Sequence, residues 1–144
     1  MSAPTSYNER VQLACDLIAN GDQDARLYLR LVCYAARLMD DLVDGDHGQV
    51  DVHRLFHVLL VELPGCAFLV RHREALLPIH STTLQAWRDS DVWLLAGGHK
   101  RQHALAFRDY LTELGLYVAL LAGGFEHRQA ISLKVRELLF KPED

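Results

Sequence analysis

Residues 23–43 read QDARLYLRLVCYAARLMDDLV, and this stretch decides the fold class. Its apolar side chains recur every three or four positions, which is the period of an α-helix that buries one face. Asp22 precedes the stretch as an N-cap candidate, and residues 44–48, DGDHG, follow it as a turn. We therefore predict a helix from about Gln23 to Val43.

The same helical period continues toward both ends of the chain. Ser6-Tyr7-Asn8-Glu9 is a capping box that predicts a first helix, which Asn20-Gly21 ends. Another helix is predicted from Asp51 to Leu63-Pro64-Gly65. The side chains expected to point inward are Tyr7, Val11, Ala14 and Ile18 in the first helix, and Val52, Leu55, Phe56, Leu59 and Leu60 in the later one.

The second half of the chain also has helical spacing throughout. We predict a short helix within Cys66–Leu76, one that Pro78 opens and Gly97-Gly98 closes, and one over 99–122. Gly123-Gly124 ends that helix, and a last helix buries Ile131, Val135, Leu138 and Leu139. No strand-like alternation is found, so the expected fold is all-α, a compact bundle of six to seven helices in one domain over 1–144.

Composition excludes several classes of protein. The 144 residues are 50% hydrophobic and carry 19 acidic and 15 basic side chains, which is typical of a globular domain and unfavourable for a nucleic-acid partner. Cys15, Cys33 and Cys66 form no CxxC pair and are expected to be small buried hydrophobes. Without a secretory signal or an 18-residue apolar run, we expect no membrane span and a cytoplasmic location.

Four carboxylates, those of Asp40, Asp41, Asp44 and Asp46, lie within seven residues at the C-terminal end of the central helix. The helix dipole makes anions unfavourable there, so a compensating cation is expected. At 100° per residue around the helix axis, Asp40 and Asp44 lie about 40° apart, and Asp41 lies about 60° beyond Asp44. The three carboxylates can therefore converge on one site. Oxygen ligands of this kind suit Mg²⁺.

The motif Asp40-Asp41-Leu42-Val43-Asp44, with the preceding residues 34–37, YAAR, resembles the first aspartate-rich motif of class I isoprenoid synthases. The squalene and phytoene synthase branch is the most similar. The resemblance implies that Asp40, Asp41 and Asp44 bind Mg²⁺ that holds a prenyl diphosphate. It also implies a second acidic motif on a facing helix.

Asp109 and Glu113, spaced i and i+4, are the candidates for that second motif and further metal ligands. Arg37 would neutralise phosphate charge, and Arg37 with Glu113 would form the catalytic set. The implied function is Mg²⁺-dependent binding or turnover of a diphosphate-bearing ligand, by diphosphate ionisation or pyrophosphohydrolysis.

The same residues also have a purely structural interpretation. Arg37 and Asp41 are spaced for an ion pair on a solvated helix face. Asp109 and Glu113 can pair with Arg108 or Arg30, and Glu113 can form a buried salt bridge.

A second, looser resemblance is to small uncharacterised proteins of tailed bacteriophages. It depends on residues 41–46 (DLVDGD), 61–64 (VELP), a helix with Trp87 and Trp93, and 120–124 (LLAGG). It implies a phage or prophage origin and a location in the host cytoplasm. The alternative function is therefore a non-enzymatic helical protein that binds a host or virion protein. The apolar last two helices also suit a homodimer.

Overall fold

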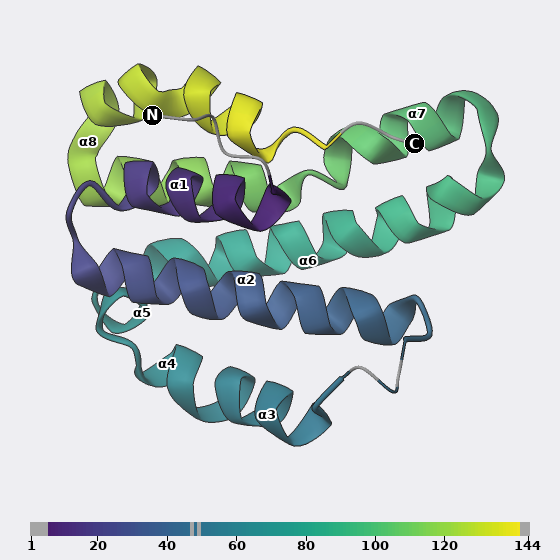
Figure 1. The fold of residues 1–144 in the computed structure, drawn as a ribbon, viewed down its shortest axis with the longest axis horizontal. Helices are drawn as coiled ribbons and strands as arrows, with labels where there is room; N and C mark the ends of the chain where they lie inside the picture. Colours follow the sequence, from purple (N-terminus) through teal and green to yellow (C-terminus); the bar gives the residue numbers. More distant parts are fainter. Residues whose placement is uncertain (1–5, 47, 49, 142–144) are drawn as a thin grey trace. The chain divides into compact units, whose positions relative to one another are not determined.

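The computed structural model describes residues 6–46, 48 and 50–141, and in these residues every regular element is helical (Figure 1). The all-α prediction is confirmed. The elements are α1 Tyr7–Ala19, α2 Gln23–Val43, α3 Val52–His57, the π-helix η2 Val58–Glu62, α4 Leu63–Gly65, α5 Ala67–Arg71, α6 Arg73–Ala96, α7 Gly98–Phe107 and α8 Tyr110–Leu139. Because α3, η2 and α4 are continuous, the described part has six helices, or seven with the short α5. His47 of the predicted turn lies outside the described residues.

The chain divides into two compact units. Unit 1 comprises Met1–Asn20 and Glu74–Asp144, and unit 2 comprises Gly21–Arg73. The expectation of a single domain over 1–144 stays a prediction. The two acidic motifs belong to different units, since α2 is in unit 2 and α8 is in unit 1.

In unit 1, α1 packs against α8. The Ser6 hydroxyl accepts a hydrogen bond from the Glu9 amide at 3.1 Å, which confirms the predicted cap of α1. The two helices approach closely at Gly115, where a Cβ atom would lie 2.9 Å from Cδ1 of the buried Ile18. Of the side chains predicted to point inward from this helix, Ala14 and Ile18 are buried, whereas Tyr7 is exposed.

The α8 helix bends at Gly124, where φ is 87° and ψ is 178°, so its two halves run in opposite directions (Figure 1). His127 follows the bend, and its Nε2 donates to the carbonyl oxygen of Ile18 at 3.2 Å. After the bend Val135 and Leu138 are buried. The predicted break at Gly123-Gly124 is confirmed, as is part of the apolar face of the last helix.

Two helix boundaries in unit 1 differ from those predicted. Pro78 does not open a helix, because α6 begins at Arg73 and continues through Pro78 at the loss of one backbone hydrogen bond. The helix predicted over 99–122 is interrupted: α7 ends at Phe107 and α8 begins at Tyr110. Asp109 is the N-cap of α8, with a ψ of 40° that is not helical.

In unit 2, α2 has the predicted bounds, Gln23–Val43. Asp22 Oδ1 accepts from the amides of Asp24 and Ala25 at 2.9 and 3.2 Å. The buried rings of Tyr28 and Phe68 lie 5.4 Å apart and join α2 to α5.

The three cysteines are free thiols. Cys15 and Cys66 are buried, and Cys33 is partly buried.

The buried face of the helix after Asp51 differs from the prediction. Asp51 caps α3, and Leu55 is buried as expected. However, Phe56 is 56% exposed and Leu60 is 71% exposed. The buried face continues from Leu55 to Val58, one helical turn on, and Leu60, about 140° around the helix from Leu55, points away from it.

Candidate functional site

The aspartate-rich end of α2 is terminated by backbone hydrogen bonds. Gly45 has φ 88°, its amide donates to the carbonyl of Leu42 at 3.3 Å, and the Asp46 amide donates to the carbonyl of Asp41 at 2.9 Å. These two bonds form a Schellman motif. The residues Asp44-Gly45-Asp46 therefore terminate the helix, whatever else their side chains do.

The carboxylates at this end have no basic residue in the last turn of α2. Arg37 is exposed and Asp41 partly buried, and these two described side chains do not form the expected i,i+4 ion pair. Among the described residues, no group of three or more His, Cys, Asp or Glu side chains is arranged to hold a metal ion. Magnesium binding by Asp40, Asp41 and Asp44 stays a prediction.

The second acidic motif lies at the N-terminal end of α8, in unit 1. The Thr112 hydroxyl donates to Asp109 Oδ1 at 2.6 Å. Burial of part of the Asp109 side chain raises its pKa, and the negative charge of Glu113 adds to this. The Thr112 hydrogen bond and the charge of Arg136 act in the opposite direction.

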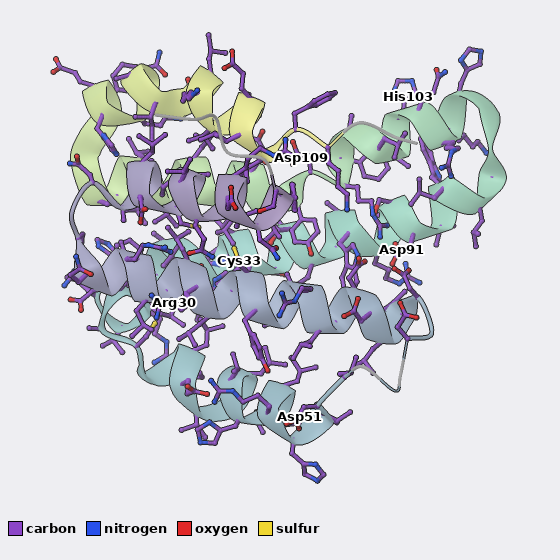
Figure 2. All side chains as sticks on the ribbon, in the orientation of Figure 1. Arg30, Cys33, Asp51, Asp91, His103 and Asp109 are labelled. Carbon is purple, nitrogen blue, oxygen red and sulfur yellow. The ribbon has the colours of Figure 1, made fainter. Side chains whose placement is uncertain are left out.

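Glu113 is not the buried residue that was expected. Its side chain is 60% exposed and accepts from Arg136 Nη1 at 2.7 Å, and this bond raises the pKa of Arg136. Arg108, one of the expected partners, forms an ion pair with Asp91 instead, also in unit 1. Figure 2 labels Asp91 and Asp109 on their helices. Arg30, the other expected partner, belongs to unit 2. The facing of the two acidic motifs stays a prediction.

A cleft of about 780 Å³ in unit 1 was not predicted from the sequence. Three cationic side chains, those of Arg101, Arg108 and Lys141, lie on its walls together with the carboxyl of Asp109. Its apolar surface includes Leu105 and Phe140. The sequence does show the basic run 99–103, HKRQH, but no local pattern indicates that the C-terminal segment approaches it.

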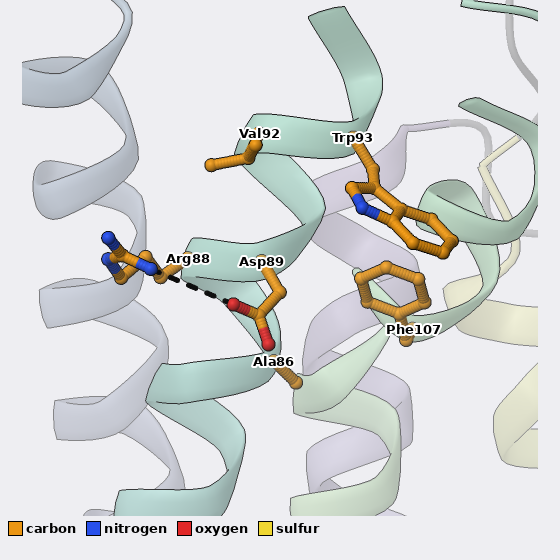
Figure 3. Close-up of a pocket in the computed structure, with 6 residues that line it drawn as sticks. All are labelled: Ala86, Arg88, Asp89, Val92, Trp93 and Phe107. Carbon is orange, nitrogen blue, oxygen red and sulfur yellow. Dashed lines mark ion pairs between the residues drawn. The ribbon is translucent and has the colours of Figure 1, made fainter. Parts of the chain in front are cut away.

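A second hollow of about 610 Å³ lies beside α6 in the same unit (Figure 3). The Trp93 ring meets that of Phe107 edge-on, with centroids 5.9 Å apart, and Lys100 lies over Trp93 at 5.8 Å. Arg88 and Asp89, on the same helix, form an ion pair at 3.8 Å on its rim. With one local ion pair and two aromatic rings, this hollow has no convergent set of reactive groups.

Comparison with known proteins identifies no relative: no protein-family model, curated protein or solved structure matches the chain. In the part of the chain that the structure describes, no helix combines the length and the apolar character needed to cross a bilayer.

Proposed function

We propose that this protein binds another protein through an apolar surface of unit 2 and carries out no chemistry there. The surface, which we name the α3–η2 face, consists of Val52, Phe56, Leu60 and Val61, with exposures of 40%, 56%, 71% and 56%. This cluster of exposed side chains carries the proposal. Large apolar side chains gathered on a surface are typical of protein interaction sites, because burial of their area stabilises a complex.

Polar groups on the same helices suit the rim of such an interface. The π-helical turn allows His57 and Glu62, five residues apart, to meet with 2.8 Å between Nδ1 and Oε2. Arg54 donates to the same carboxylate, and these two neighbours hold the pKa of Glu62 below its usual range. A polar rim around an apolar centre favours a partner with an apolar helix or groove. For a phage-encoded chain, the partner would be a host or virion protein.

The test is the double variant Phe56→Ser/Leu60→Ser. Because both side chains are exposed, the variant should unfold at the same temperature as the wild type, or slightly higher, while losing the partner. Cross-linking in cells that express each form, followed by reconstitution with the purified candidate, measures the loss. Val70→Ser, an exposed apolar residue of α5, is the matched control and should keep the partner.

Equal binding by the wild type and the double variant would contradict the proposal, as would strong destabilisation of the variant. Sedimentation velocity on the same proteins distinguishes the kind of partner. If the wild type dimerises and the double variant does not, the partner is a second copy of the chain.

A second candidate function is Mg²⁺-dependent binding of a diphosphate-bearing ligand at the end of α2. It is favoured by one observation, that acids occupy the negative pole of α2 with no basic residue in its last turn. In this proposal Asp40, Asp41 and Asp44 hold the metal, and Arg37 neutralises phosphate charge. Diphosphate ionisation or pyrophosphohydrolysis is the chemistry that such a site supports.

This candidate is tested by thermal unfolding of the wild type and of Asp41→Asn/Asp44→Asn, with and without millimolar Mg²⁺ and pyrophosphate. Ligand at 100 times Kd stabilises by about 2.7 kcal/mol, which is a shift of several degrees. A shift that the double variant loses and Phe56→Ser/Leu60→Ser keeps would support the metal site. No shift in the wild type would eliminate it.

A further inference from the structure

The hollow beside α6 is lined by side chains of two helices, α6 and α7 (Figure 3). Ala86, Asp89 and Trp93 have the spacing i, i+3 and i+7, so they lie on one face of α6. Phe107, the last residue of α7, lines the hollow with them. Because Ala86 contributes only a methyl group, α6 does not fill the space beside the rings. The volume of about 610 Å³ is within the range of small-molecule sites.

Two aromatic rings form part of the wall of this hollow. The rings of Trp93 and Phe107 have their centroids 5.9 Å apart and their planes inclined at 67°. Trp93 is 39% exposed, and its neighbour Val92 is 57% exposed. A flat ring that covered these side chains would remove their apolar area from water and add the attraction between aromatic rings. The wall therefore favours an aromatic ligand over an aliphatic one of the same size.

Lys100 places a positive charge at the edge of the aromatic pair. Its Nζ lies 5.8 Å from the centroid of the Trp93 ring, which is a cation–π distance. Within the part of the chain that the structure describes, the Lys100 ammonium has no carboxylate partner. Arg88 and Asp89, by contrast, pair with each other at 3.8 Å. The ammonium of Lys100 is thus available to an anionic group on a ligand that stacks beside it.

We infer that this hollow binds a small aromatic carboxylate, with its ring against Trp93 and Phe107 and its carboxylate at Lys100. The inference is independent of the proposed function, because the lining residues belong to unit 1 and the α3–η2 face belongs to unit 2. Asp89 contributes a carboxylate to the lining, and its pairing with Arg88 reduces its repulsion of the ligand.

The experiment is isothermal titration of the full chain with 2-naphthoate at pH 7, where we expect one saturable site. Decahydro-2-naphthoate is the matched ligand, with the same carbon skeleton and charge but no aromatic ring. It should bind about threefold to tenfold more weakly, because it cannot stack. The cation 2-naphthylmethylammonium keeps the ring but reverses the charge beside Lys100, so it should also bind more weakly than 2-naphthoate.

Variants assign the binding to the hollow. Trp93→Leu keeps an apolar side chain but removes the ring, and it should weaken 2-naphthoate binding about threefold to tenfold. Phe125→Leu is its control, at a ring that is 67% exposed elsewhere in unit 1. Lys100→Gln should weaken the binding about twofold to fivefold, as expected for an exposed charge contact. Lys134→Gln, at an exposed lysine of α8, is the control for this variant.

The ion pair at the rim gives a test with opposite signs. Asp89→Asn should strengthen 2-naphthoate binding, because it removes the carboxylate of the lining. Arg88→Gln should weaken the binding, because it leaves the Asp89 carboxylate without its partner. Both side chains are well exposed, 67% and 79%, so neither substitution should alter the fold.

Four results would overturn the inference. The first is the absence of saturable binding of 2-naphthoate to the wild type, and the second is equal affinity for its saturated analogue. The third is an affinity that Trp93→Leu and Lys100→Gln leave the same as their controls do. The fourth is binding that Phe56→Ser/Leu60→Ser abolishes, which would assign the ligand to the α3–η2 face. Lys100→Gln keeps the test valid if Trp93→Leu fails to fold, since Lys100 is exposed.

Discussion

The two acidic motifs lie at opposite poles of their helices. Asp109 and Glu113 are at the N-terminal end of α8, where the dipole favours anions, and their partners are Thr112 and Arg136. The carboxylates of α2 are at its C-terminal end, where the dipole disfavours them and the last turn has no basic residue. Within the described part of the chain Glu113 thus has a cationic partner, whereas Asp41 and Asp44 form no ion pair.

This difference makes the α2 carboxylates a better candidate for a functional site than the α8 carboxylates. The Asp109 carboxylate accepts from the Thr112 hydroxyl and Glu113 pairs with Arg136, so both have a structural role. Carboxylates that destabilise their own helix require a compensating interaction, such as a bound cation. Substitutions on each side of this comparison should change stability by different amounts, the most at Gly45 and the least at Asp109.

Gly45→Val should have the largest effect. The Schellman motif that ends α2 requires φ 88° at Gly45, and a β-branched residue in that conformation costs about 2 kcal/mol. Urea unfolding measures the loss. Gly65→Ala, at a helical glycine with open space around its Cβ position, is the control and should be neutral or stabilising. Equal midpoints for the two variants would mean that the motif does not stabilise the end of α2.

Thr112→Val should destabilise the start of α8 by about 1 kcal/mol. Thr112 is buried, and the nearly isosteric valine removes the hydroxyl that donates to Asp109 while keeping the packing. Chemical unfolding measures this difference. Thr83→Val is the matched control, because the Thr83 hydroxyl donates only to a carbonyl of its own helix. This variant should lower the free energy of unfolding by a smaller amount. A neutral Thr112→Val would remove the local explanation for Asp109.

Asp41→Asn/Asp44→Asn should stabilise the metal-free protein by about 0.5 to 1 kcal/mol, because it removes two anions from the negative pole of α2. Asp24→Asn is the mirror experiment. Asp24 lies in the first turn of the same helix, 3.4 Å from Arg71, so its loss should be destabilising. Unfolding in chelator at low salt gives both values. Destabilisation by the double variant would show that the α2 carboxylates stabilise the fold in a metal-free state.

Much of the helical fold was predictable because its signals are local. Ser6 and Asp22 are N-caps in the structure as in the prediction, and Asn20 has the expected left-handed conformation. Errors arose where tertiary structure overrides periodicity. Leu60 is exposed within the π-helix η2, and α6 continues through Pro78. Neither change has a signal in a single sequence.

The candidate site was less predictable than the helices. The prediction placed Asp109 and Glu113 inside a helix over 99–122, whereas in the structure they lie at the start of α8, and their partners could not be chosen in advance. Arg136 reaches Glu113 because α8 reverses at Gly124. The same reversal returns the C-terminal segment, with Lys141, to the cleft of unit 1. A long-range contact of this kind depends on the angle of a bend, which spacing does not encode.

Glu113→Gln should destabilise by only about 0.5 kcal/mol. The ion pair with Arg136 is exposed on both sides, 60% and 41%, and solvent screens such pairs. A double-mutant cycle with Arg136→Gln isolates the coupling, which should weaken further when salt is raised to 1 M. A coupling several times larger, and insensitive to salt, would mean that Glu113 belongs to a more rigid site than its exposure indicates.

The pH dependence of stability should show the smallest effect and should isolate Asp109. Its pKa is raised in the folded protein, mainly by burial, so the folded state binds the proton more tightly than the unfolded state. Stability is therefore lost as pH rises from the unfolded pKa through the folded one, and the loss persists at neutral pH. Asp109→Asn cannot ionise and should be more stable than the wild type at pH 7, by a few tenths of a kcal/mol after allowance for solvent screening. Unfolding of both proteins between pH 3 and 7 gives the difference. If the difference in free energy of unfolding disappears toward pH 3, the effect belongs to this carboxyl. A difference that stays constant with pH would mean that the asparagine acts through hydrogen bonding alone.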